Sequence, residues 1–228
     1  MAYLFLVPEW FINFRVIMEL LFFVVAGLVS LYSFKIYNLS YQRESRIFGV
    51  GFLLISISYL LRAIITIFLF TKLEEGVRGI ALENLNLIGT FGVYIHMIIF
   101  TLGLITILYT TFKTKCWQVY SLLAVTDLLL LKLSANKTLS FYMFSTILIF
   151  YICVHYAKEY IKYKNGKTAL IFIAFVLLLL STIEPIFSNT YNTYVISDVI
   201  ELGAYLLIAL SLFLTIKKSH IIKRKTAG

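Results

Sequence analysis

The chain has 228 residues, of which 61% are hydrophobic, 17% aromatic and only 14% charged, whereas soluble domains carry about 25% charged residues. This composition excludes an ordinary soluble protein. The formal net charge is +9, but the basic residues stand at the ends of apolar segments, which favours contact with lipid headgroups over binding of nucleic acid.

Long apolar segments separated by short polar connections run through the whole chain. Segments of roughly 17–25 apolar residues are typical of transmembrane helices, because a helix satisfies its own backbone hydrogen bonds in lipid. We predict helices at residues 16–37, 47–70, 87–111, 117–133, 139–160, 169–187 and 195–216. The fourth is the shortest and carries Asp127. The predicted fold is an all-α, polytopic membrane protein, a seven-helix bundle that forms one domain over residues 1–228, and the expected location is the cell membrane.

The distribution of Lys and Arg predicts the orientation, because short connections rich in these residues stay in the cytoplasm. With the N-terminus outside, fourteen would be cytoplasmic: Lys35, Arg43, Arg46, Lys113, Lys115, Lys158, Lys162, Lys164, Lys167, Lys217, Lys218, Lys223, Arg224 and Lys225. Five would be external: Arg15, Lys72, Arg78, Lys132 and Lys137. We therefore expect an external N-terminus and a cytoplasmic C-terminus.

Ionisable residues inside the predicted spans are the main guide to function, because each is costly in lipid unless it is paired or hydrated. These residues are Glu19, Arg62, His96, Asp127, Glu184, Asp198 and Glu201. Polar stripes with helical spacing accompany them on the second, sixth and seventh spans. The stripes are Ser58, Tyr59, Arg62 and Thr66; Ser181, Glu184 and Ser188; and Tyr194, Asp198, Glu201 and Tyr205.

We expect these stripes to face one polar, mainly acidic pocket in the outer half of the bundle. Its predicted ligand- or ion-binding residues are Arg62, Glu184, Tyr194, Asp198, Glu201 and Tyr205. Arg62 would be the counter-charge to one or two of the acids, and the pocket would bind a small ligand, a cation or a proton. The alternative is structural: the acids of the seventh span would lie at headgroup depth, and Arg62 with Glu184 would form a packing ion pair.

Neither catalysis nor a bound cofactor or metal is predicted. His96 and His155 would lie roughly 13 Å and 24 Å from the outer edge of the membrane, too far apart in depth to share a haem. Cys116 and Cys153 are the only cysteines, so neither a disulfide framework nor a metal site is supported. Gly51, Gly92 and Gly103 are interpreted as points of close helix packing.

The seven-span topology resembles that of microbial rhodopsins, and residues 198–202, Asp-Val-Ile-Glu-Leu, are similar to the last helix of that family. That helix bears an aspartate four residues before the retinal lysine. Here Leu202 takes the place of the lysine, and the seventh span has no lysine before Lys217. A retinal Schiff base is therefore not expected.

The first two spans, with their connection Tyr-Gln-Arg-Glu-Ser-Arg at residues 41–46, resemble the seven-helix membrane sensor modules that precede prokaryotic signalling domains. This resemblance implies a stand-alone receptor or an accessory to a partner. We therefore expect a receptor-like or transport protein in the lipid bilayer. The alternative is a non-catalytic structural or accessory subunit that binds a membrane or cytoplasmic partner protein.

Overall fold

The computed structural model describes residues 9–74, 82–112, 117–187 and 191–226. Its elements are α1 (Glu9–Ser40), α2 (Arg43–Glu74), α3 (Leu82–Thr111), α4 (Trp117–Leu133), α5 (Lys137–Tyr163), α6 (Gly166–Phe187) and α7 (Tyr191–Thr226). All are helices, and no strand occurs in the described part of the chain. Arg78, Lys113, Lys115, Cys116 and Ser188, which entered the sequence interpretation, lie outside the described residues.

The predicted helices are confirmed, and most of them extend beyond the predicted bounds by several residues. The apolar segments predicted only the part that can lie in hydrocarbon, whereas turns that contain charged residues, such as residues 9–15 with Glu9 and Arg15, continue α1 outward. Six helices, all except α4, are long and apolar enough to cross a membrane. At 17 residues, α4 is the shortest helix.

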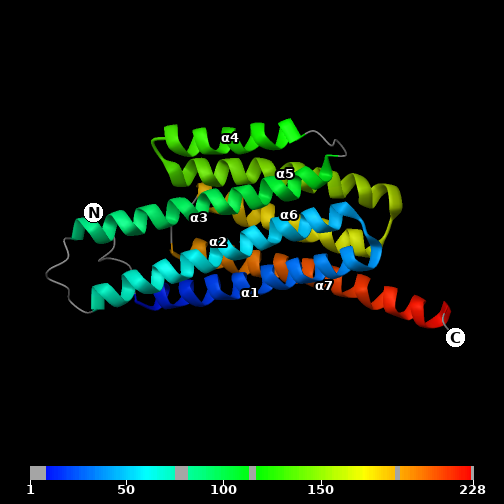
Figure 1. Ribbon diagram of the computed structural model, residues 1–228. Coiled ribbons are helices and arrows are strands. Elements are labelled where there is room, and N and C mark those ends of the chain that lie inside the picture. The colour runs from blue at the N-terminus through cyan, green and yellow to red at the C-terminus, as the bar shows by residue number, and fades with distance from the viewer. Residues whose placement is uncertain (1–8, 75–81, 113–116, 188–190, 227–228) are drawn as a thin grey trace.

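Six of the helices close into a ring (Figure 1). Each helix packs against the next in the order α1, α2, α3, α5, α6 and α7, and α7 returns to α1. The remaining helix, α4, lies outside this ring against α3 and α5. The chain therefore encloses a central axis that is lined by six helices.

Polar contacts hold α4 on the outside of the ring. The Thr101 hydroxyl of α3 donates a 2.6 Å hydrogen bond to Asp127 Oδ2, and the Asp127 side chain is fully buried. Nearer the other end of α4, the hydroxyls of Thr106 and Tyr120 are 3.3 Å apart. Because an aspartate in an apolar setting needs a polar partner, Asp127 fixes the face that α4 turns toward α3.

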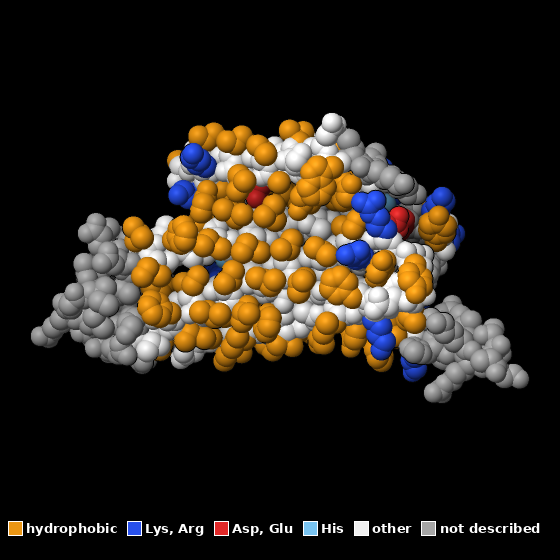
Figure 2. All heavy atoms as spheres, in the orientation of Figure 1, with side chains coloured by type: hydrophobic (Ala, Val, Ile, Leu, Met, Phe, Trp, Pro, Cys, Tyr) orange, Lys and Arg blue, Asp and Glu red, His pale blue; other side chains and the backbone are white. Residues whose placement is uncertain are grey.

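Apolar side chains cover most of the outer surface (Figure 2). Large hydrophobic residues are exposed on every helix of the ring and on α4, while the Lys and Arg side chains gather mainly toward the two ends of the bundle. Inside, hydroxyls bond to the backbone of neighbouring helices: Ser30 to the Gly49 carbonyl at 2.9 Å and Ser56 to the Phe23 carbonyl at 2.8 Å. This arrangement is the one expected of helices packed in lipid.

Glycines allow α2 and α3 to approach closely, as the sequence predicted. A Cβ atom at Gly103 would lie 2.9 Å from the Gly51 carbonyl oxygen and 2.7 Å from Ile55 Cγ1. A Cβ atom at Gly51 would lie 3.0 Å from the Gly103 carbonyl oxygen, and one at Gly92 would lie 2.4 Å from Ile65 Cδ1. Only glycine fits these points without a shift of the neighbouring helix.

Replacing Gly103 with Ala should therefore destabilise the bundle by about 1–3 kcal/mol, because the added methyl group meets the backbone of α2. Gly203→Ala is the matched control, since no heavy atom lies within 4 Å of a Cβ atom there, and alanine is the better helix former. Thermal unfolding of the purified protein in detergent should show a lower Tm for Gly103→Ala only. Equal Tm values for the two variants would contradict the close packing of α2 on α3.

Candidate functional site

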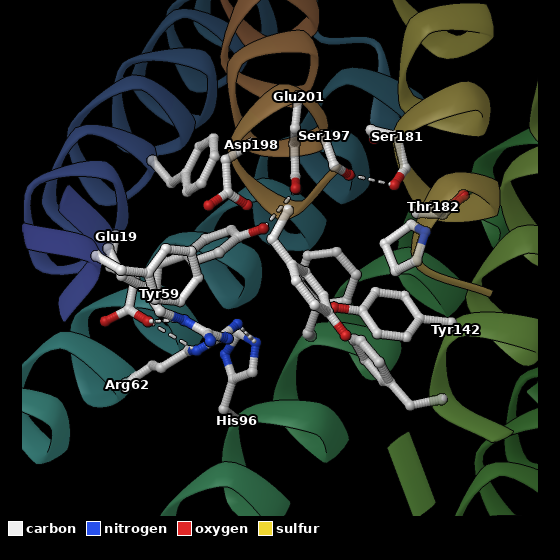
Figure 3. Close-up of a pocket in the computed structure, with 17 residues that line it drawn as sticks. Glu19, Tyr59, Arg62, His96, Tyr142, Ser181, Thr182, Ser197, Asp198 and Glu201 are labelled. Atoms are coloured by element: carbon white, nitrogen blue, oxygen red, sulfur yellow. Dashed lines mark hydrogen bonds and ion pairs between the residues drawn. The ribbon is translucent and has the colours of Figure 1, made fainter. Parts of the chain in front are cut away.

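A narrow cavity of about 40 Å³ lies between the six ring helices, in the half of the bundle where α1 and α7 begin (Figure 3). We call it the polar cavity. Each ring helix contributes side chains to its wall, and α4 contributes none. Its charged and histidine lining residues are Arg15, Glu19, Arg62, His96, Asp198 and Glu201. The cavity therefore gathers ionisable groups from α1, α2, α3 and α7.

Glu19 of α1 is the centre of an ion-pair cluster. Arg62 Nε of α2 lies 2.8 Å from Glu19 Oε1, and Arg15 Nε lies 3.4 Å from the same oxygen. The Thr66 hydroxyl donates to Glu19 Oε2 at 3.2 Å. The Glu19 side chain is only 3% exposed, so its charge depends on these partners rather than on water.

His96 of α3 extends this cluster and has a defined tautomer. Its Nδ1 lies 3.0 Å from the Ser58 carbonyl oxygen, and its Nε2 lies 3.3 Å from Arg62 Nη1. A carbonyl oxygen can only accept and a guanidinium can only donate, so Nδ1 carries the proton and Nε2 accepts. His96 is therefore a neutral imidazole that holds the Arg62 guanidinium in place beside Glu19.

Glu201 of α7 is the centre of a second cluster, in which the partners are tyrosines. The hydroxyls of Tyr59 and Tyr205 both donate to Glu201 Oε1, the latter at 2.9 Å. Both tyrosine side chains are at most 5% exposed. Within the described residues, no cation lies at ion-pair distance from Glu201.

Asp198, one helical turn before Glu201, lines the same cavity (Figure 3). Beside it, the buried Ser197 hydroxyl donates to the Ser181 carbonyl of α6 at 2.5 Å. This bond fixes α7 against α6 and turns the face that carries Asp198 and Glu201 toward the cavity.

Tyr59 joins the two clusters. Its hydroxyl belongs to the Glu201 cluster, while its ring centroid lies 5.4 Å from that of His96 in the Glu19 cluster. On the other side, its ring packs on Phe22 of α1 at 4.8 Å. The two clusters thus form one continuous layer of polar groups across the ring.

The structure brings most of the predicted site residues together. Arg62, Tyr194, Asp198 and Glu201 line the polar cavity, and Tyr205 contacts it through its bond to Glu201. Glu184 is half-buried and is not among the lining residues. The carboxylate that pairs with Arg62 is Glu19. Helical spacing placed Glu184 on the stripe of Ser181 but could not show that the stripe turns out of the cavity at this point.

The residues that line the cavity without having been predicted as ligand- or ion-binding residues include Arg15, Glu19, Tyr59 and His96. Glu19, Tyr59 and His96 were recognised as polar groups at membrane depth, but nothing in the sequence showed which helices are neighbours. The i, i+4 spacing of Arg15 and Glu19 was the one local signal of an ion pair. The closure of α1 against α7 then brings Glu19 and Asp198 to the same cavity.

No protein-family model matches this chain, and no significant match occurs among curated proteins or solved structures.

The Arg62–Glu19 pair gives a direct test of the first cluster. Arg62→Met should leave Glu19 with Arg15 alone and destabilise the protein by about 3–5 kcal/mol, because a buried charge loses its closest partner. Adding Glu19→Gln to Arg62→Met should recover part of the loss. Thermal unfolding of the two single variants and the double variant in detergent measures the coupling. Additive effects would mean that the two side chains do not interact.

Proposed function

We propose that this chain is a seven-span protein of the cell membrane whose outward-facing polar cavity exchanges protons, in a receptor-like or transport role. The observation that carries the proposal is the charge balance of the cavity. Two arginines, Arg15 and Arg62, face three acids, Glu19, Asp198 and Glu201. In surroundings of low dielectric constant, one excess negative charge strongly favours the uptake of a proton or of one small cation.

The size of the cavity and the spacing of its acids favour a proton over a metal ion. A volume of about 40 Å³ admits only a few water molecules. Among the described residues, no three His, Cys, Asp or Glu side chains lie close enough to hold a metal ion together. Water molecules in the cavity would instead carry protons between its mouth and the Asp198 and Glu201 carboxyl groups.

Seven crossings are supported by the path of the chain around α4. In Figure 1, α3 and α5 run in the same direction, and α4, which connects them in the chain, runs in the opposite direction on the outer side of the bundle. At 17 residues, α4 is roughly 25 Å long, close to the roughly 30 Å of a bilayer core. Its outer face is apolar, with Leu122, Val125 and Leu129 exposed.

The orientation proposed from the sequence makes the polar cavity outward-facing. The cavity lies in the half of the bundle where α1 and α7 begin, and the basic residues are most frequent near the other end. Since Lys and Arg accumulate in cytoplasmic connections, the cavity would lie on the external side. Glu19 would then be roughly 9 Å below the start of the α1 span at Asn13.

A second cavity favours a role in which protons pass through the bundle, besides a role in sensing. It has a volume of about 190 Å³, lies near the opposite end of the bundle and is also lined by all six ring helices. Glu44, His155 and Glu159 contribute to its wall, with His155 Nε2 3.7 Å from Glu159 Oε1. Between the two cavities lies the buried Phe52, whose ring packs on Tyr205 on one side and on Phe48 of the second cavity on the other. Polar groups therefore approach the ring axis from both ends.

A structural or accessory subunit remains the alternative function. In that role the acids would serve packing alone and the apolar outer surface would bind a partner. The alternative predicts that neutralising Asp198 or Glu201 changes nothing but stability.

Infrared difference spectra of the reconstituted protein between alkaline and acidic pH test the proposal. The spectrum of the unmodified protein should contain a carboxyl band that grows as the pH falls, because protonation creates a C=O group. Glu201→Gln and Asp198→Asn should each remove part of this band. Glu184→Gln is the matched control, since Glu184 is an acid of the same half that does not line the cavity.

An unchanged band in both Glu201→Gln and Asp198→Asn would contradict proton exchange in the polar cavity. The protein reconstituted into liposomes that contain a pH-sensitive dye separates transport from sensing. An internal pH change after external acidification that is absent in Glu201→Gln would indicate passage, and its absence in the unmodified protein would indicate sensing.

A further inference from the structure

A larger, separate chamber adjoins the polar cavity. It has a volume of about 400 Å³, within the range of roughly 300–1,000 Å³ that is usual for small-molecule sites. It lies mainly between α2 and α3, near the end of α2 and the beginning of the α3 span. Its apolar wall includes Ile65, Leu69, Phe70, Val93 and Met97. We call it the α2–α3 chamber.

Within the described part of the chain, the charged residues that line the chamber are two arginines, Arg15 and Arg62. None of the acids of the polar cavity, Glu19, Asp198 and Glu201, lines the chamber. An apolar wall with positive charge at one end is complementary to a molecule that has a hydrocarbon body and an anionic head.

Both arginines have donors left for such a head group. A guanidinium has five N–H groups. Glu19 engages the Nε atoms of Arg15 and Arg62, and His96 engages Nη1 of Arg62. Among the described residues, these contacts with Glu19 and His96 use neither the Nη groups of Arg15 nor Nη2 of Arg62. These N–H groups belong to residues that line both the chamber and the polar cavity.

The charge count favours a head group with a single negative charge. When Asp198 and Glu201 are protonated, two guanidinium groups and the one carboxylate of Glu19 leave one net positive charge in this cluster. A carboxylate matches that charge and can take two parallel N–H bonds from one guanidinium. A doubly charged phosphate would leave one negative charge uncompensated in apolar surroundings.

We propose that the α2–α3 chamber binds a single-chain amphiphilic carboxylate, with its head group on Arg15 and Arg62 and its hydrocarbon chain along Leu69, Phe70 and Val93. From Arg62 to Phe70 the α2 wall is roughly 12 Å long, which a medium-length alkyl chain can follow. The molecule could arrive from water or from the bilayer, since the chemistry it presents is the same.

This inference rests on the proposed proton exchange in one respect. Asp198 and Glu201 line the polar cavity beside the same Arg15 and Arg62, so the anion is favoured when both of these acids are protonated. Proton exchange and carboxylate binding can fail separately, because they are measured differently. Carboxylate binding is tested at one fixed pH by probe displacement, whereas proton exchange is tested by the infrared carboxyl band.

The test is displacement of a fluorescent fatty acid from the full-length protein in nanodiscs of neutral lipid, with decanoate and decanol as competitors. Decanoate should compete at least ten times more strongly than decanol, because only decanoate has the charge. Arg15→Gln should remove that preference. Lys137→Gln, which removes a cation that does not line the chamber, should keep it.

A second pair of variants tests whether the hydrocarbon chain lies in the chamber, independently of Arg15. Val93→Phe places a larger side chain on the chamber wall and should weaken fatty-acid binding at least tenfold. Val199→Phe makes the same change at an exposed position of α7 that does not line the chamber, and should leave binding unchanged. Circular dichroism of each variant establishes that it is folded.

Three outcomes would overturn the proposal. Equal competition by decanoate and decanol would show partition into lipid only. Equal binding by Val93→Phe and Val199→Phe would place the probe outside the chamber. Loss of probe binding by the unmodified protein in nanodiscs that contain phosphatidylglycerol would assign the site to a two-chain anionic lipid instead.

Discussion

The low solubility of charge in hydrocarbon is the constraint on which this structure depends. Each ionisable side chain at membrane depth must find a partner inside the protein or reach water. The ring of six helices meets this requirement by turning Glu19, Arg62 and Glu201 toward one cavity. Asp127 meets it separately, through Thr101 at the contact between α4 and α3. The arrangement of helices and the position of the polar site therefore have the same cause.

The sequence predicted the helices well, because apolar length is a local property that the bilayer imposes directly. It also predicted that Arg62, Asp198 and Glu201 share a pocket, because their stripes repeat with helical spacing. It could not predict that Arg62 pairs with Glu19, or that Glu184 does not line the cavity. Those facts depend on which helices are neighbours and on the rotation of each helix, and a seven-span pattern alone does not fix either.

The sequence also could not predict that α4 lies outside the ring. Its apolar residues and its buried acid resemble those of the other helices, but of the described helices only α3 and α5 contact it. Removing one helix from the ring allows α3 to meet α5 directly, so the polar cavity is closed by six helices rather than seven. The same closure brings His96 of α3 and Tyr142 of α5 into the wall of both the polar cavity and the α2–α3 chamber.

The central claim is that the polar face of α7 lines an outward-facing, hydrated cavity while the adjacent face contacts lipid. Cysteine accessibility at two neighbouring positions of α7 measures this most directly, in a background without Cys116 and Cys153. Asp198 lines the cavity, whereas Val199 is 54% exposed on the outer surface. In intact cells, a charged, impermeant thiol reagent should modify Asp198→Cys and leave Val199→Cys unmodified. Faster modification of Val199→Cys, or modification of Asp198→Cys only from the cytoplasmic side, would contradict the account.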